Sequence, residues 1–560
     1  MSKTLGGRRA RRSRADADGE AAKYAIIDSM EKVATDIYSF RELREKGFTY
    51  VDKTAIMLPL CDLSIGKQFF LARPRRFGKS LLVSTLHCLF EGRRELFHGL
   101  AIEPQWDWSR SWPVIHLDMG TIETETVAEF RQAILALLRS EAERLNVRPS
   151  EEELPSSVFR QLIHDVAATS SDGQCVVLVD EYDKPILRHL SRPDITAFRD
   201  ELKPFYGVIK YTEEKQRFAL LTGVSKFSKV SIFSDLNNLI DLTMTASEAT
   251  LLGYTHDELK RCFPDSLKKI AAANGLTPEG AFAKVIAWYD GYRFDPDGEK
   301  VINPVSFGLC AKAGRFQTYW STTAMTTFLT DALRKQPLDF STIDIDQSAL
   351  EAYEPDHPRL VTLLYQTGYL TIKDVRDYNG FRVFSLTFPN REVSNSFLTS
   401  LAPVYAGLGQ DAATNYQLAA MRAILADDAE KFVKALKSFF ANIPYNLTDR
   451  QNEQMWQTIV YVILKSVGFG VNAEVLTNEG RIDMTCETPT RIWLIEFKLD
   501  RPAEEALAQI DERNYAEKFD FAGKTVRKLG ISFSSESRTI VDVKMAEAHV
   551  SRADRQVRKT

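Results

Sequence analysis

The sequence predicts an α/β fold class with three folded domains, and three observations predict it. Up to about residue 250, short apolar runs alternate with segments of helical periodicity. This alternation is typical of a parallel sheet with helices on both faces. From about residue 251 helical periodicity dominates, which indicates a mainly helical second domain. After residue 441 a helix, three strands, a second helix and a last strand follow one another, as in a small α/β domain.

The composition narrows the class of protein. The 560 residues suffice for two to four domains, and an apolar fraction of 44% with a charged fraction of 26% is ordinary for globular proteins. The net charge of −4 excludes a wholesale basic coat, so any nucleic-acid surface must be local. The six cysteines include no Cys-x-x-Cys pair, which favours a reducing cytoplasm over a disulfide framework or a zinc site. Because no apolar run is long enough to span a bilayer, we expect no membrane partner.

Both ends of the chain are basic. Five arginines lie between Arg8 and Arg14, and no apolar segment follows them, so they form no secretory signal. We interpret residues 1–22 and 546–560 as disordered, solvated tails, because short runs of charge are usually solvated. The alternative is an electrostatic arm that contacts nucleic acid.

The first domain, assigned to residues 23–250, contains a strand that leads directly into a glycine-lysine turn. This strand covers residues 68–72, and residues 80–90 follow with helical periodicity that ends near Gly92. Further apolar runs are expected to complete a parallel sheet. The remaining predicted elements are strands at residues 113–118, 175–179 and 217–221 and a helix at residues 127–145.

The second and third domains are assigned to residues 251–440 and 441–545. The second is predicted to be a helical connecting domain, with a helix at residues 415–440 and a strand pair around the turn signal Asn379-Gly380. The third is predicted to be a mixed domain. Its expected elements are helices at residues 449–466 and 503–517 and strands at residues 471–476, 481–486, 491–497 and 526–533.

The turn after the first strand has the residues of a phosphate-binding loop. Such a loop needs a flexible turn, inward-pointing N–H groups and a helix N-terminus behind the phosphate. Gly78 provides the turn, Lys79 is expected to reach the β- and γ-phosphates, and the hydroxyl of Ser80 is expected to hold Mg²⁺. Arg73 stands where the full pattern has a glycine. A surface turn with a solvated lysine is the alternative, because a lone Gly-Lys-Ser occurs by chance.

A second apolar strand supplies the acidic residues that this loop needs. Asp180 and Glu181 follow four apolar residues, at the carboxyl edge where ligands bind in open α/β sheets. We expect Asp180 to hold Mg²⁺ through water and Glu181 to polarise the attacking water. Thr222, at the end of a third strand, is a candidate for sensing the γ-phosphate. The alternative for Asp180 and Glu181 is a solvated strand end.

The third domain contains residues typical of metal-dependent phosphodiester cleavage. Glu496 and Lys498 are two apart on a predicted strand and therefore share one face. Asp483 lies on the preceding strand, and pairing is expected to bring it beside Glu496 as a second ligand of Mg²⁺. Lys498 is expected to orient the attacking water or to stabilise negative charge. Glu453 is a further candidate metal ligand, and a surface salt-bridge pair is the alternative interpretation of Glu496 and Lys498.

Several ordered motifs resemble the AAA-ATPase-like family that is commonly joined to a C-terminal PD-(D/E)XK nuclease domain. The resemblance spans most of the chain, and the family's loop often has the sequence found here, so Arg73 is a family trait. The motifs are Phe40-Arg-Glu-Leu-Arg44, Tyr50-Val-Asp-Lys-Thr54, Arg73-Pro-Arg-Arg-Phe-Gly-Lys-Ser80, Leu178-Val-Asp-Glu-Tyr-Asp183, residues 221–238, Trp288-Tyr-Asp-Gly-Tyr-Arg-Phe294, Asn303-Pro304 and the C-terminal set.

This resemblance implies a P-loop ATPase fold for the first domain and a restriction-endonuclease-like α/β fold for about residues 440–545. It implies ATP and Mg²⁺ as cofactors, with Arg73, Gly78, Lys79, Ser80, Asp180 and Thr222 as the nucleotide-binding residues. It also implies Asp483 and Glu496 as metal ligands, Lys498 as the catalytic lysine and Glu181 as the base of ATP hydrolysis. The resemblance leaves the role of residues 50–54 unassigned.

The sequence therefore predicts a cytoplasmic, bacterial-type ATPase fused to a Mg²⁺-dependent nuclease, with DNA or RNA as its partner. We expect nucleotide binding to gate cleavage by changing the arrangement of the domains. One alternative is a nucleotide-switched signalling or nucleic-acid-binding protein with an inactive nuclease-like domain. Another is an ATPase with a purely structural C-terminal region. A homo-oligomer is compatible with the first domain, and the sequence does not decide the oligomeric state.

Overall fold

The structure is a computed structural model that forms two compact units. It describes residues 31–190, 192–227, 238–320, 343–353, 359–406, 408–442, 453–477, 480–519, 523–537 and 539–547, together with residues 329, 332, 333, 338 and 340. The first unit spans Met1–Tyr319 and Asp346–Arg382, and the second spans Trp320–Ile345 and Val383–Thr560. Residues 1–22 and all but two residues of the predicted C-terminal tail lie outside the described residues.

The first unit is built on a five-stranded sheet in the order β2-β3-β4-β1-β5, and every neighbouring pair is parallel. This sheet confirms the predicted fold class of the first unit. The strands β1 and β3 are buried at every position, as expected for a parallel sheet that is covered on both faces. The strands are β1 (Gln68–Ala72), β2 (Val114–Asp118), β3 (Cys175–Asp180), β4 (Gln216–Gly223) and β5 (Ile240–Asp241).

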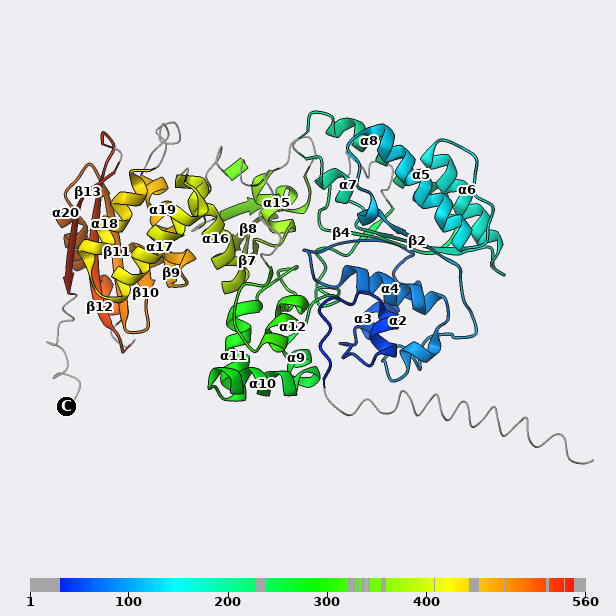
Figure 1. The fold of residues 1–560 in the computed structure, drawn as a ribbon, viewed down its shortest axis with the longest axis horizontal. Coiled ribbons are helices and arrows are strands. Elements are labelled where there is room, and N and C mark those ends of the chain that lie inside the picture. Colours follow the sequence, from blue (N-terminus) through cyan, green and yellow to red (C-terminus); the bar gives the residue numbers. More distant parts are fainter. Residues whose placement is uncertain are drawn as a thin grey trace, which may run out of the picture. The chain divides into compact units, whose positions relative to one another are not determined.

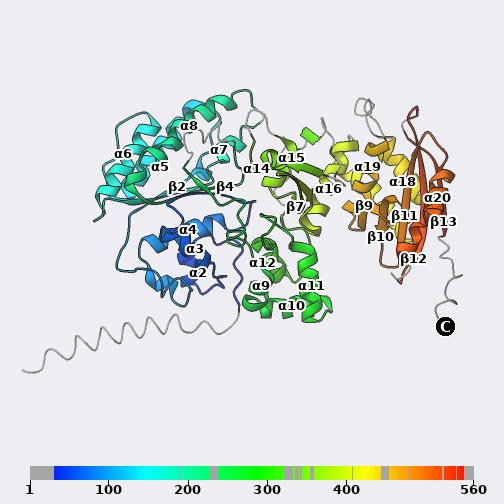
Figure 2. The same ribbon diagram turned by 180° about the vertical axis from the view of Figure 1, so that it is seen from behind.

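Helices cover both faces of this sheet. In Figure 1, α5, α6 and α8 lie on one face and α2, α3 and α4 lie on the other, and Figure 2 shows the same layers from behind. The bounds are α2 (Phe40–Glu45), α3 (Thr54–Cys61), α4 (Lys79–Phe90), α5 (Val127–Arg144), α6 (Pro155–Ala168), α7 (Lys184–Leu187) and α8 (Ile195–Tyr211). The Thr126–Glu129 capping box explains why α5 begins where it does.

Four helices after the sheet enclose an apolar core of their own. They are α9 (His256–Cys262), α10 (Pro264–Asn274), α11 (Pro278–Tyr289) and α12 (Pro304–Ala313). Phe263, Ile270, Val285 and Phe307 are buried together in this core. These helices account for the helical periodicity after residue 251, and they belong to the first unit.

The chain passes from one unit to the other within a three-stranded sheet in the order β6-β8-β7. The predicted strand pair is present, and both turn residues are left-handed, with φ of 54° at Asn379 and 90° at Gly380. The elements of this region are β6 (Ile343–Asp346), α14 (Gln347–Glu351), α15 (Leu360–Gln366), β7 (Thr371–Tyr378) and β8 (Phe381–Thr387).

The second unit contains a five-stranded mixed sheet in the order β13-β12-β11-β10-β9. Its two faces are covered by different helices. On one face Phe497 stacks on Phe533, which stacks on Trp456 of α19. On the other face the neighbouring residue Glu496 accepts a hydrogen bond from Gln509 of α20. The strands are β9 (Gly470–Leu476), β10 (Arg481–Glu487), β11 (Arg491–Leu499), β12 (Thr525–Ser534) and β13 (Thr539–Glu547). The helices are α16 (Arg391–Ala406), α17 (Gln410–Leu425), α18 (Ala429–Phe440), α19 (Glu453–Ser466) and α20 (Ala503–Glu512).

Two of the predicted helices are shorter than expected, and three strands, β5, β6 and β13, were not predicted. The helix predicted at residues 415–440 is wrong as a single element, because Asp427 adopts a φ of 62° and separates α17 from α18. The helix predicted to reach residue 517 ends at Glu512, close to Asn514 with a φ of 46°. The half-exposed strand β13 was not predicted, since its apolar residues alternate too weakly.

Candidate functional site

The loop between β1 and α4 encloses a buried lysine. Gly78 lies directly before α4 with a φ of 99°, a conformation that favours glycine. The Nζ of Lys79 donates hydrogen bonds to the backbone oxygens of Arg73 at 2.8 Å and Pro74 at 3.1 Å. Burial lowers the pKa of Lys79, while the carboxylates of Asp180 and Asp183 act in the opposite direction. Ser80 follows in the first turn of α4 and is half-buried.

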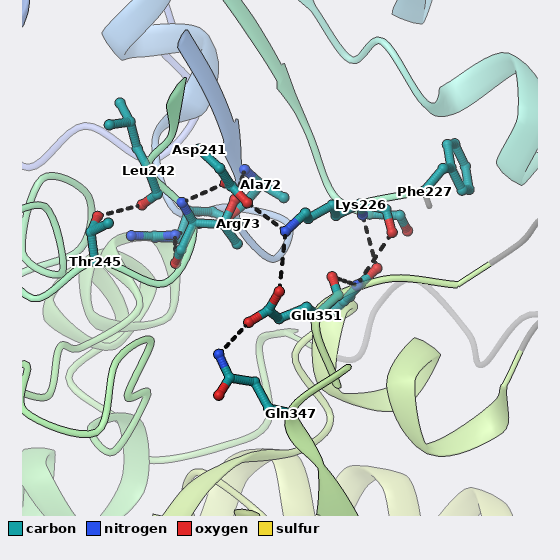
Figure 3. A network of polar contacts seen from close by, with 12 residues as sticks. Ala72, Arg73, Lys226, Phe227, Asp241, Leu242, Thr245, Gln347 and Glu351 are labelled. Carbon is teal, nitrogen blue, oxygen red and sulfur yellow. Dashed lines mark hydrogen bonds and ion pairs between the residues drawn. The ribbon is translucent and has the colours of Figure 1, made fainter. Parts of the chain in front are cut away.

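The side chain of Arg73 is held by the protein itself. Its guanidinium donates to the backbone oxygens of Ala72 at 3.0 Å, Thr243 at 2.7 Å and Glu248 at 3.2 Å, and it lies 4.2 Å from the ring centroid of Phe294. Figure 3 shows Arg73 beside Ala72, Leu242 and Thr245. Burial lowers its pKa to about 10. These contacts let Arg73 fix the start of the loop, and its expected contact with nucleotide stays a prediction.

The carboxyl ends of β3 and β4 bring Asp180, Glu181 and Thr222 together. Thr222 Oγ1 donates to Asp180 Oδ1 at 2.6 Å, and the backbone N–H of Glu181 donates to the same oxygen at 2.9 Å. Glu181 has a φ of 50°, and its carboxylate pairs with Lys184 at 2.9 Å. The polar residues that the sequence singled out on two strands therefore meet at the edge of the sheet that also carries the lysine loop.

Asp118 is a further acid of this edge that the sequence analysis missed. It ends β2 directly opposite Asp180, and burial together with the charges of Asp180 and Glu181 raises its pKa. A Cβ at Gly120 would lie 2.4 Å from Glu181 Oε2, so a larger residue there would require this carboxylate to move. The signal in the sequence was the polar residue at the end of the apolar run 113–118, which is the same signal that identified Asp180.

A mostly apolar pocket opens beside this loop. Phe77, Gly78 and Leu81 line it from the loop and α4, and Leu252 lines it from the segment before α9. Tyr50, Val51 and Lys53 also line it, so the motif whose role was unassigned lies next to the lysine loop. Lys53 is held there by the carboxylate of Glu258 at 2.6 Å.

Gly223 occupies a position that has no room for a side chain. A Cβ there would lie 2.4 Å from Asp183 Oδ1 and 2.6 Å from the ring of Tyr182, and both residues are buried. We expect Gly223→Ala to lower the free energy of unfolding by about 3 kcal/mol or more, because packed groups must move. Gly280→Ala in α11, where the nearest atom would be 3.3 Å away, is the matched control. Equal thermal unfolding midpoints for both variants would contradict this packing.

Asp183 predicts a pH dependence of stability. Burial raises its pKa from an ordinary 3.8 to about 6, although Oδ2 accepts hydrogen bonds from the N–H groups of Val224 at 3.0 Å and Ser225 at 2.6 Å. Because the pKa of Asp183 is higher in the folded chain than in the unfolded chain, its protonation stabilises the fold by about 3 kcal/mol below about pH 4. This stabilisation is lost as the pH rises through 6.

In Asp183→Asn this titration is absent and an acceptor oxygen remains. The variant is therefore expected to lose less stability than the wild type between about pH 4 and pH 7. Calorimetric unfolding at intermediate pH values measures both slopes. Identical slopes for the two proteins would mean that Asp183 titrates at its ordinary pKa in the folded chain.

The strands β10 and β11 bring two carboxylates together in the second unit. The backbone N–H of Asp483 donates to Glu496 Oε1 at 3.1 Å, and the backbone N–H of Phe497 donates to Asp483 Oδ2 at 2.9 Å. Glu496 is fully buried, and burial together with the charge of Asp483 raises its pKa well above the usual range of a glutamate. Two neighbouring acids therefore share a space in which two negative charges repel one another.

Gln509 of α20 links this acidic pair to the lysine. Its Nε2 donates to Glu496 Oε2 at 2.8 Å, and its Oε1 accepts from Lys498 Nζ at 2.7 Å. The hydroxyl of Tyr515 accepts from the backbone N–H of Arg481 and donates to its carbonyl oxygen at 2.8 Å, which fixes the start of β10. The side chain of Glu453 lies outside the described residues, so its expected role as a ligand stays a prediction.

These carboxylates fit a divalent cation. Oxygen ligands suit Mg²⁺, and a cation between Asp483 and Glu496 would remove the repulsion that raises the pKa of Glu496. Asp483 and Glu496 make a small set of metal ligands. In the described part of the chain, no group of three or more His, Cys, Asp or Glu side chains could hold a metal ion. Further ligands must therefore come from backbone oxygens, water, substrate or side chains outside that part.

Comparisons with known proteins agree with this division into two sites. Residues 34–233 match the family model of a predicted AAA-ATPase, and residues 451–543 match that of the PD-(D/E)XK nuclease superfamily. An "Uncharacterized protein in vnfD 5'region" of Azotobacter chroococcum mcd 1 is 35% identical over 528 residues, which cover 92% of this chain and 98% of that protein. No solved structure matches. Among the helices of the described residues, none has the length and apolar character needed to cross a bilayer.

Proposed function

Because the chain belongs to the family of AAA-ATPase-like proteins that carry a C-terminal domain of the PD-(D/E)XK nuclease superfamily, we propose that it is an ATP-gated, Mg²⁺-dependent nuclease. The contact chain Asp483–Glu496–Gln509–Lys498 is the observation that carries the nuclease part of this proposal. Nucleic acid, DNA or RNA, is the proposed substrate, and the bacterial cytoplasm is the proposed compartment.

In the first unit, Gly78 and Lys79 would bind the phosphates of ATP. Ser80 and Asp180 would hold Mg²⁺, which neutralises charge on the phosphates when it is bound. Thr222 positions Asp180 through their 2.6 Å hydrogen bond. Glu181 is the proposed base for the attacking water, and to act it must exchange its ion pair with Lys184 for that water.

The apolar cavity beside Gly78 supports a binding site for the base of the nucleotide. A planar base needs a mostly apolar pocket with a few polar groups at its rim. Leu81 and Leu252 supply apolar walls, and Tyr50 and Lys53 supply polar groups. This assignment gives the Tyr50–Thr54 motif a role in nucleotide binding.

In the second unit, Asp483 and Glu496 would hold the metal ion, with Glu453 as a further ligand. The ion supplies Lewis acidity toward the phosphodiester when it is bound. Lys498 would stabilise negative charge on the scissile phosphate, and Gln509 holds its ammonium group at 2.7 Å. Gln509 is therefore a positioning residue for both Glu496 and Lys498.

Two assays on the full chain test this proposal separately. In the first, Mn²⁺ binding is measured by calorimetry in the wild type and in Asp483→Ala, where we expect binding to be lost. In the second, DNA and RNA are incubated with Mg²⁺ in the presence and absence of ATP. Cleavage that responds to ATP supports the whole proposal, and an absence of cleavage with intact Mn²⁺ binding rejects the nuclease. The mass of the ATP-bound protein in solution distinguishes a monomer from a homo-oligomer.

A nucleotide-switched protein that holds nucleic acid without cutting it is the second candidate. The observation that favours it is the complete burial of Glu496, together with the lack of a third acidic side chain at this point among the described residues. ATP and nucleic-acid binding without cleavage at any Mg²⁺ concentration is the outcome that distinguishes this candidate.

A further inference from the structure

The loop after β4 is tied to the acidic edge of the nucleotide site. We call residues 224–227 the β4 loop. The N–H groups of Val224 and Ser225 donate to Asp183 Oδ2 at 3.0 Å and 2.6 Å, and Tyr182 Oη donates to the backbone oxygen of Ser225 at 2.8 Å. All three hydrogen bonds involve residues of the turn that follows Asp180 at the end of β3. The turn and the β4 loop are therefore linked directly.

The same loop is held from its other side by a segment that lies more than a hundred residues later. We call residues 346–353 and 359–370 the α14–α15 segment. Gln366 Oε1 accepts from the backbone N–H of Lys226 at 2.9 Å, and Gln366 Nε2 donates to the backbone oxygen of Glu351 at 3.0 Å. Tyr353 Oη donates to Ser225 Oγ at 3.2 Å. Gln366 is 6% exposed and Tyr353 is 3% exposed, so these bonds are shielded from water.

A charged network joins Lys226 to both the sheet and this segment (Figure 3). Lys226 Nζ lies 2.5 Å from Asp241 Oδ2 of β5 and 3.9 Å from Glu351 Oε2 of α14. Gln347 Nε2 donates to the other carboxylate oxygen of Glu351 at 2.6 Å. Figure 3 shows the Lys226 side chain extended between the two carboxylates, with Glu351 oriented toward it.

The α14–α15 segment also packs on the lysine loop. Gly368 has a φ of 90°, and a Cβ at this position would lie 2.7 Å from Pro74 Cβ. Pro74 is one of the two residues whose backbone oxygens bind Lys79 Nζ. The segment therefore contacts both loops that surround the proposed phosphate site, one after β1 and one after β4.

After Leu370 the chain continues directly into β7, and after the β7–β8 turn it enters the second unit at Val383. Thr371 anchors the start of β7, since its Oγ1 accepts from the N–H of Arg293 at 2.8 Å. The α14–α15 segment is thus joined covalently, through one hairpin, to the unit that carries Asp483 and Glu496.

We propose that the α14–α15 segment is the coupling element that reads the nucleotide state and passes it to the second unit. The inference rests on the proposed function. A bound terminal phosphate draws Lys79 away from the oxygens of Arg73 and Pro74, and the lysine loop then shifts against Gly368. The same ligand pulls on Asp180 and, through the turn after β3, on the β4 loop and Gln366. Both routes converge on the α14–α15 segment, and the proposal requires this segment to change its arrangement when nucleotide binds.

Hydrogen exchange of the full chain tests the proposal without relying on cleavage. Adenylyl imidodiphosphate with Mg²⁺ is the probe, and the amides of residues 73–80, 360–370 and 264–274 are followed. We expect exchange to slow by about threefold or more at residues 73–80 and 360–370, with no change in the control helix α10. Protection of residues 73–80 alone overturns the coupling and leaves nucleotide binding intact. Protection at neither segment overturns both.

Variants of the α14–α15 segment sharpen this test. In Gln366→Ala we expect residues 73–80 to keep their protection, while the response of residues 360–370 and the ATP dependence of cleavage are both lost. Glu351→Gln keeps the shape of the side chain and removes its charge, which weakens the contact with Lys226. It replaces Gln366→Ala in this test if that variant does not fold. Gln216→Ala removes an equally buried glutamine at the other end of β4 and is the matched control. A wild-type response of residues 360–370 in both Gln366→Ala and Glu351→Gln overturns the proposal.

Discussion

Lys498→Ala is expected to slow Mg²⁺-dependent cleavage of nucleic acid by about 10²–10³-fold, because it removes the positive charge that Gln509 links to the Asp483–Glu496 pair. The ammonium group would act through its positive charge on the transition state. The substitution should therefore lower the cleavage rate at saturating substrate. Initial rates on labelled DNA and RNA at fixed Mg²⁺ measure it. Metal binding should persist, since the two carboxylates remain.

Two controls make this result specific. Lys544→Ala removes a lysine from β13 in the same sheet, where it pairs with Glu504 at 2.9 Å, and it should leave the rate within about twofold of wild type. Gln509→Ala should lower the rate and weaken metal binding together, since Gln509 contacts Glu496 as well as Lys498. If wild type and Lys498→Ala cleave every substrate equally, the proposed nuclease site is wrong.

Lys79→Ala is expected to weaken ATP binding by about 100-fold or more, because two charge-assisted hydrogen bonds to phosphate are lost. Calorimetric titration with ATP and Mg²⁺ measures this change. The substitution also leaves the oxygens of Arg73 and Pro74 without their present donor, so thermal unfolding is followed in parallel. Lys79→Met, which keeps most of the apolar stem, separates lost charge from lost packing.

Lys260→Ala is the matched control for this titration. Lys260 lies on α9, and its ammonium group is 4.5 Å from the ring centroid of Phe282, so its removal should leave ATP affinity unchanged. An unchanged affinity in Lys79→Ala would remove the loop between β1 and α4 from the nucleotide site. A weakened affinity in both variants would indicate a general loss of structure.

The sequence predicts most of the elements that carry the two sites, because their signals are local. A continuous apolar run followed by a glycine and a lysine predicts β1, the loop and α4. The contact between Asp483 and Glu496 follows from their positions on two consecutive strands. In both cases residues that are close in the chain determine the geometry.

The features that the sequence did not reveal depend on distant contacts. The acceptors of the Arg73 guanidinium include Thr243 and Glu248, about 170 residues away, so its burial cannot be derived from the loop sequence. Gln366 contacts Lys226 across 140 residues, and no periodicity marks that pair. The break between α17 and α18 depends on one left-handed aspartate in an otherwise helical pattern.

The hydrogen bonds from Lys79 to the carbonyl groups of Arg73 and Pro74 mean that an anion that binds Lys79 competes with an intramolecular partner. A single inorganic phosphate offers few contacts in exchange and should be a poor competitor. In the proposed site, a magnesium-bound triphosphate would also engage the helix start and the acidic strand ends, and these contacts together would displace the carbonyls. If the loop binds nucleotide as proposed, this competition would favour polyphosphates over orthophosphate.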